Sequence, residues 1–125
     1  MFDTLDVFRM AHGMAAHAGR RQALIAGNIA RVDMPGEVAR DIAPFSEVWD
    51  ATSRPGPSRT RAGHLVTGWS RSPDVMTETS NADPNGNTIS VETEMVKSSE
   101  TRQQHEIALA IYRNALNVIR HGLGR

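Results

Sequence analysis

The sequence predicts a mainly α-helical protein, with a long helix at each end and an irregular middle that can hold short β-strands. All six prolines lie from position 35 to position 84, so neither end contains the residue that most strongly disrupts helix interiors. Apolar side chains at both ends recur at alternating steps of three and four residues, as in helices that pack together as a coiled-coil-like pair. We therefore divide this single domain into an N-terminal assembly helix (1–33), an outward-facing middle segment (34–89) and a C-terminal assembly helix (90–125).

The N-terminal helix is predicted over residues 3–32. Its apolar face consists of two rows of residues at seven-residue spacing, Phe8, Ala15, Gln22 and Ile29 in one row and Ala11, Ala18, Ile25 and Val32 in the other. Glycines in the same segment weaken an isolated helix, which indicates close packing against neighbours. We expect the helix to stop at the motif Asp33, Pro35, Gly36, because proline disfavours helical backbone in the preceding residue and glycine accepts a positive φ.

The C-terminal helix is predicted over residues 90–123. One face is continuous over the whole length, at steps of four and three: Val91, Met95, Ser98, Arg102, His105, Leu109, Tyr112, Leu116, Ile119 and Leu123. This is the 3.5-residue period of a coiled-coil seam. Either Thr88 or Ser90 is the predicted N-cap, and Glu92 and Glu94 are assigned to favourable electrostatics at the helix N-terminus.

The middle segment contains all the prolines and both tryptophans. Residues 54–59 are predicted to be an exposed loop. Three apolar patches, at 42–49, at 65–66 with Trp69, and at 75–76, are each predicted to be a short strand or a docking turn. A compact domain seldom keeps so long a stretch irregular, so we expect the middle to become ordered against a partner or along the outside of an assembly.

No enzymatic site is predicted. The chain has no cysteine, which excludes disulfides, thiolate metal sites and a cysteine nucleophile. His12 and His17 are five residues apart, whereas two zinc ligands on a helix need a spacing of four. A glycine-rich phosphate loop and a G-x-S-x-G elbow are both missing from the sequence, and we predict no catalytic residue, no cofactor and no metal ion.

Charge and hydropathy exclude further classes. The 14 basic and 14 acidic residues cancel, so the chain has no overall field that would attract nucleic acid. No apolar run is long enough for a transmembrane segment, and the acidic N-terminus does not look like a cleaved signal peptide. A soluble helical adaptor or a nucleic-acid-associated regulatory protein is the alternative interpretation that stays open.

Two sequence boxes resemble those of the bacterial flagellar axial proteins. Residues 26–36, AGNIARVDMPG, are similar to the Asn-Ile-Ala and Asp-x-Pro-Gly motif of that family. Residues 85–95, NGNTISVETEM, are similar to the entry into the C-terminal helix of its short proximal-rod members. Three positions depart from the family pattern, because Arg31 replaces an asparagine, Met34 a threonine and Glu37 an aromatic residue.

The resemblance implies a structural subunit of the proximal rod of the bacterial flagellum, with no enzymatic activity. Such subunits are exported through the flagellar type III export apparatus without a cleaved signal peptide, and they polymerise in the basal body across the periplasm. The implied partners are copies of itself, other rod proteins and the rod adaptor at the export gate. The predicted assembly residues are Leu5, Phe8, Ile25, Asn28 and Ile29 on the first helix, and Met95, Leu109, Tyr112, Leu116 and Ile119 on the second.

Overall fold

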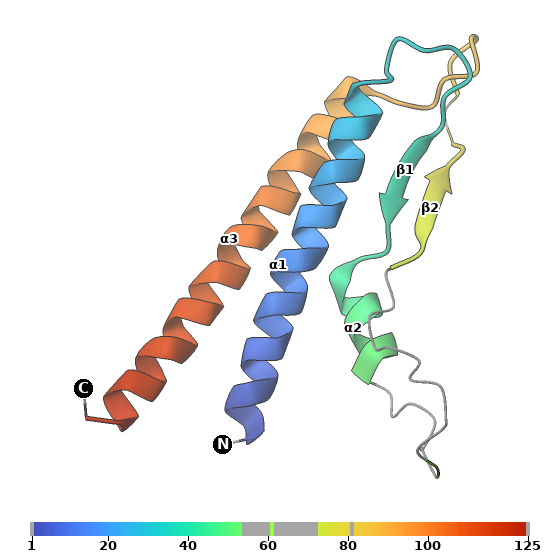
Figure 1. Ribbon diagram of the computed structural model, residues 1–125. Helices are drawn as coiled ribbons and strands as arrows, with labels where there is room; N and C mark the ends of the chain where they lie inside the picture. The colour runs from blue at the N-terminus through green and yellow to red at the C-terminus, as the bar shows by residue number, and fades with distance from the viewer. Residues whose placement is uncertain (1, 54–60, 62–72, 81, 125) are drawn as a thin grey trace.

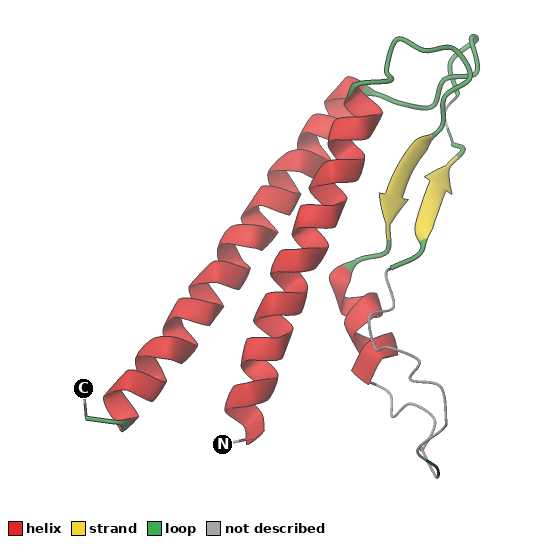
Figure 2. Ribbon diagram, in the orientation of Figure 1, coloured by secondary structure: helices red, strands yellow, loops and turns green. Residues whose placement is uncertain are grey.

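The computed structural model describes residues 2–53, 61, 73–80 and 82–124. Its elements in chain order are α1 (Phe2–Ile29), β1 (Ala39–Ile42), α2 (Phe45–Ser53), β2 (Val75–Glu78) and α3 (Val91–Gly122). Helices α1 and α3 lie side by side and antiparallel, with both chain ends at the same end of the pair (Figure 1). The two strands and α2 lie beside α1, away from α3 (Figure 2). The predicted fold class is confirmed.

The contact between α1 and α3 is made largely of small side chains at seven-residue spacing. On α1 the buried row is Ala11, Ala18 and Ile25, and on α3 it is Thr101, Ala108 and Ala115, with Glu94 one heptad earlier. Small side chains let two helix backbones approach closely. Thr101 is polar, and its hydroxyl donates to the carbonyl of Lys97 at 2.7 Å within its own helix. Of the two N-terminal rows predicted from the sequence, the row that contains Ala11, Ala18 and Ile25 is the one that is buried.

The α3 face that contacts α1 differs from the predicted seam. Ala108 and Ala115 face α1, whereas Leu109 and Leu116, which follow them by one position, lie about 100° round the helix. The predicted seam is the more apolar row, but the smaller residues permit the closer helix contact. The seam is left beside the pair contact, with Tyr112 reaching Phe8 edge-on at a ring-centroid distance of 5.2 Å.

The described part of the middle segment packs against α1 of the same chain, so these residues do not need a partner in order to fold. A position along the outside of an assembly stays a prediction. Strand β1 pairs antiparallel with β2, with Ala39 opposite Glu78 and Ile42 opposite Val75. The apolar patch at 42–49 is the end of β1 and the start of α2, and the patch at 75–76 lies in β2. The 65–66 patch, Trp69 and the 54–59 loop lie outside the described residues.

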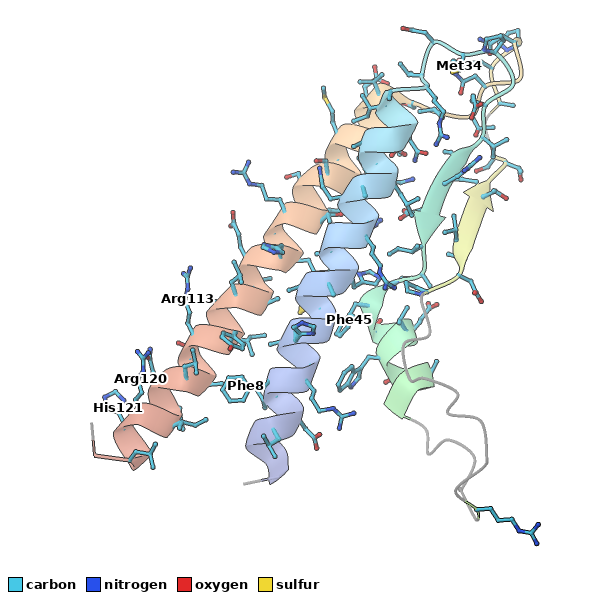
Figure 3. All side chains as sticks on the ribbon, in the orientation of Figure 1. Phe8, Met34, Phe45, Arg113, Arg120 and His121 are labelled. Atoms are coloured by element: carbon cyan, nitrogen blue, oxygen red, sulfur yellow. The ribbon has the colours of Figure 1, made fainter. Side chains whose placement is uncertain are left out.

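Helix α2 docks through aromatic side chains onto a glycine of α1. A Cβ atom built at Gly13 would lie 3.5 Å from the Phe45 ring and 3.8 Å from the Trp49 ring. The two aromatic rings also contact each other, with centroids 5.8 Å apart. Figure 3 shows Phe45 directed toward α1. The glycine lets α2 lie close to α1, and the two rings cover this side of α1.

Both terminal helices end close to where the sequence signals them. Helix α1 stops at Ile29, three residues before Val32, because the chain tightens to i→i−3 bonds such as Arg31 N–H to the Asn28 carbonyl at 2.9 Å. Gly36 has a φ of 76°, as the stop motif predicts. Helix α3 is capped by Ser90, whose side chain accepts from the Thr93 N–H, and this settles the choice between Ser90 and Thr88.

Candidate assembly surface

The two sequence boxes meet at the end of the helix pair away from the termini. We call this region, residues 30–38 with residues 82–90, the loop-end junction. The Gly36 N–H donates to the Asn85 carbonyl at 3.1 Å, and the Thr88 N–H donates to the Glu37 carbonyl at 3.0 Å. The Thr88 hydroxyl accepts from the Ala39 N–H at 2.9 Å, so this threonine joins the second box to the residues that directly follow the first.

Asn87 fills the centre of the junction and is 2% exposed. Its amide nitrogen donates to the carbonyl of Val32, just after α1. Its amide oxygen accepts from the Ile89 N–H at 2.8 Å. Asn87 thereby satisfies a carbonyl that the end of α1 leaves unpaired and also fixes the approach to α3.

A second buried asparagine joins three elements. Asn28, which is 0% exposed, donates from its amide nitrogen to the Arg40 carbonyl at 2.8 Å and to Glu94 at 3.0 Å. Its amide oxygen accepts from the Arg40 N–H at 3.1 Å. One side chain of α1 therefore satisfies both backbone groups of a β1 residue and also contacts α3.

The contact with Glu94 extends into a polar network, which we define as Arg21, Asn28, Asp41, Glu78, Glu94 and Lys97. The Lys97 ammonium lies 2.7 Å from Glu78, 3.3 Å from Glu94 and 3.7 Å from Asp41. Arg21 binds both carboxylate oxygens of Asp41, at 2.9 Å and 3.0 Å. The network therefore connects the two strands to both long helices.

The network changes the ionisation of its members. Burial alone would raise the pKa of Asp41, but hydrogen bonds from Arg21 and from the Ile42 N–H, with the charges of Arg21 and Lys97, hold that pKa below its ordinary value. Burial also acts to lower the pKa of Lys97, and the hydrogen bond to Glu78 with the charges of Glu94 and Glu78 reverses this, so the pKa is raised. The hydrogen bond to Asp41 raises the pKa of Arg21. All three groups are thus held in their charged forms at neutral pH.

Most of this network was not predicted from the sequence. Glu94 was assigned to the electrostatics of a helix N-terminus, but it is 1% exposed and binds Asn28. One feature of the sequence could have marked Lys97 as special, because it is the single lysine in a chain with 13 arginines. The pairing of Arg21 with Asp41 had no signal, since the two residues are 20 positions apart.

Another buried polar group links the same elements farther along α1. His17 is 5% exposed, and its Nε2 lies 2.8 Å from the carbonyl oxygen of Ala43, with Gln104 of α3 near its other ring nitrogen at 3.4 Å. Since a carbonyl only accepts, Nε2 carries the proton. His17 therefore has a structural role, and among the described residues no three His, Cys, Asp or Glu side chains could hold a metal ion.

The helix pair has one covered flank and one flank that other elements of the described chain leave uncovered. The strands and α2 cover the side of α1 that carries His17, Arg21 and Asn28. Gln22 follows Arg21 and Ile29 follows Asn28 by one position, so both lie about 100° round α1 from the covered side. The contacts of Phe8 with Tyr112 and of Gln22 with Ser98 place the seam of α3 on this same side.

We call this second side the open flank, and eight of the ten predicted assembly residues belong to it. They are Leu5, Phe8, Ile29, Met95, Leu109, Tyr112, Leu116 and Ile119. Leu5 is 57% exposed and Met95 is 63% exposed, whereas Phe8 and Leu116 are half-buried. The other two, Ile25 and Asn28, are buried in the contact between α1 and α3 of the same chain. A row of exposed apolar side chains along two helices is the usual mark of a protein–protein contact surface.

Two of the three departures from the axial-protein pattern contact each other. Arg31 Nε lies 3.6 Å from a carboxylate oxygen of Glu37, across the stop motif of α1. Both side chains are partly buried at the loop-end junction, whereas the third departure, Met34, is exposed there (Figure 3). The ion pair therefore connects the two ends of this turn.

No protein-family model matches the chain. None of the helices in the described part of the chain is both long and apolar enough to cross a membrane.

The chain is similar along most of its length to a flagellar protein. That relative is the flagellar basal body rod protein FlgB of Agrobacterium fabrum (strain C58 / ATCC 33970), which is 29% identical over 118 residues, covering 88% of this chain and 87% of the relative. The unmatched part of this chain is shorter than either α1 or α3, so the match includes at least part of both helices. The similarity supports the resemblance seen in the two sequence boxes, and it indicates a structural role in the flagellar basal-body rod.

Proposed function

We propose that the protein is a structural, non-enzymatic subunit of the proximal rod of the flagellar basal body. The observation that carries the proposal is the open flank, which runs along both terminal helices of a chain similar to a rod protein. Other copies of the chain and other rod proteins would cover this flank. The strands and α2 would then face outward, because they lie on the opposite side of the helix pair.

The remaining steps follow from this assignment. The subunit passes through the flagellar type III export apparatus without a cleaved signal peptide, and it meets the rod adaptor at the export gate. Once assembled, its terminal helices form part of the wall of the export channel and transmit torque. Burial of half-exposed leucine and isoleucine side chains contributes about 25 cal/mol per Å² of apolar area, which supports association between subunits.

A pair of substitutions on α3 tests the proposal. Leu109 lies on the open flank and is 37% exposed, and Ile107 is 45% exposed. Because the two residues are two positions apart, they lie about 200° apart round the helix, so Ile107 faces another side. In a strain that lacks the native gene, Leu109→Asp is expected to abolish swimming and the recovery of rods in basal-body preparations. Ile107→Asp is the matched control and is expected to restore both.

Two further measurements show whether a loss of swimming comes from failed assembly or from a loss of folding or expression. Circular dichroism of the purified variants is expected to give the same helical content as the parent chain, since both leucine and isoleucine are partly exposed. Immunoblotting is expected to detect both variants at parental levels. Normal swimming of the Leu109→Asp strain would overturn the assignment of the open flank to rod assembly.

A further inference from the structure

The small buried rows of α1 and α3 leave the alignment of the two helices poorly specified by packing. Both rows repeat every seven residues, with Ala11 and Ala18 on one helix and Ala108 and Ala115 on the other. Sliding one helix past the other by one heptad would again place small side chains against small side chains at these positions, and would change the apolar surroundings mainly of Ile25 and of the Phe8–Tyr112 ring contact. The apolar contact therefore distinguishes weakly between the observed alignment and a slipped one.

The polar contacts between the helices do distinguish them. They pair Asn28 with Glu94, Gln22 with Ser98, His17 with Gln104 and Arg21 with Glu100. The Asn28–Glu94 pair is the fully buried one, at 0% and 1% exposure. A slip would separate the Glu94 carboxylate from its amide donor while it stayed buried, with Lys97 of the same helix as its remaining partner. A buried carboxylate oxygen that loses a hydrogen-bond donor costs more free energy than a small apolar contact that is replaced by a similar one.

We infer that the hydrogen bond between Asn28 and Glu94 sets the register of α1 against α3. The inference concerns the isolated chain and does not depend on the role in the flagellar rod. Asn28 suits this task because Arg40 of β1 holds its amide through two further hydrogen bonds. Its donor is thus presented to α3 at one fixed position. A single buried asparagine fixes helix register in the same way in other coiled coils.

Glu94→Leu tests the inference with little other disturbance. Asn28 keeps Arg40 as its partner and Lys97 keeps Glu78 and Asp41, so no charge is orphaned. Leucine has one non-hydrogen side-chain atom fewer than glutamate and adds an apolar side chain to the buried row. Glu94→Gln is the conservative control, since its amide oxygen can still accept from Asn28.

The cysteine-free sequence allows the register to be measured by disulfide cross-linking. Gln22→Cys with Ser98→Cys reports the observed register, because these two side chains are in contact. Gln22→Cys with His105→Cys, or with Val91→Cys, reports a slip of one heptad in either direction. In the parent background and in Glu94→Gln, only the first pair is expected to cross-link.

In the Glu94→Leu background, a slipped pair is expected to cross-link at least about tenfold more than in the parent, as the loss of a charge-assisted hydrogen bond predicts. Thermal unfolding followed by circular dichroism is expected to be cooperative at or above the parental midpoint. Cross-linking restricted to the 22–98 pair would overturn the inference and assign the register to packing and the loop-end junction. Loss of folding in Glu94→Leu would also overturn it, because the carboxylate would then be required for stability itself.

Discussion

Arg21 of α1 and Asp41 of β1 form a two-pronged ion pair, with nitrogen–oxygen distances of 2.9 Å and 3.0 Å. Each side chain is about one-fifth exposed, so water screens the pair only in part. The planar guanidinium holds both carboxylate oxygens at once, and this fixes the orientation of β1 as well as its position. The strand is thereby attached to α1 by a directional contact in addition to buried Ala39 and Ile42.

Arg21→Lys is expected to loosen β1 although the charge is kept. A lysine ammonium cannot reproduce the two parallel hydrogen bonds to Asp41, and the expected cost is about 1–2 kcal/mol of unfolding free energy. Native-state hydrogen exchange is expected to show faster exchange of the β1 amides than of the α3 amides. Arg113→Lys, at an exposed position on α3, is the control and is expected to leave both unchanged. Equal protection of β1 in the two variants would show that the ion pair does not hold the strand.

Stability is expected to fall below about pH 4 because of Asp41. Its pKa in the folded chain is below its ordinary value, and an unfolded aspartate titrates near about 3.9. The unfolded state therefore binds more protons in this range, so the stabilisation is present above about pH 4 and is lost as the pH falls through the folded pKa.

Urea unfolding between pH 7 and pH 3 measures this effect. Asp41→Asn is expected to be less stable than the parent at pH 7 and to lose less stability on acidification. Asp6→Asn serves as a control, since Asp6 pairs with Arg9 at an exposed site and exposed pairs contribute little. If the parent and Asp41→Asn showed parallel pH profiles, another carboxylate would be responsible for the acid sensitivity.

Asn28→Ala is expected to be among the most damaging single changes in the chain. It removes three hydrogen bonds, leaves the Glu94 carboxylate without its amide donor and unpairs both backbone groups of Arg40. The expected loss is about 3–5 kcal/mol of unfolding free energy, as for other broken buried charge contacts. Asn117→Ala, at an exposed position of α3, is expected to change stability by less than about 0.5 kcal/mol. Chemical denaturation that gave similar values for both would contradict the assigned role of Asn28.

Two glycine-to-alanine substitutions are expected to change stability in opposite directions. Gly86 has a φ of 81°, and a Cβ there would lie 3.6 Å from the Gly36 Cα, so Gly86→Ala is expected to cost about 1–2 kcal/mol from backbone strain. Gly19 lies in α1, and a Cβ there would meet nothing within 4 Å, so Gly19→Ala is expected to stabilise the helix by up to about 1 kcal/mol. Thermal midpoints measured by circular dichroism report both changes. A lower midpoint for Gly19→Ala would indicate a contact at that face of α1 in the isolated chain.

The sequence by itself determined the two terminal helices, their approximate limits and the positive φ at Gly36. These features depend on local signals, namely heptad spacing, the positions of proline and the conformational freedom of glycine. Both boxes at the loop-end junction were recognised as motifs, but nothing in the sequence predicted that the two boxes meet. The helix α2 was not foreseen as a helix, since its short apolar stretch fits a strand or a turn equally well.

Only the tertiary structure decided which rows of the two helices meet and which charges are buried. Apolar periodicity marks a face but does not weigh small residues against large ones, so it selected Leu109 where Ala108 makes the contact. Asn28 and Glu94 are separated by 66 positions and Arg21 and Asp41 by 20. Polar partners at such separations leave no periodic pattern in the sequence, because each is chosen by a single contact that exists only once the helices and strands have packed.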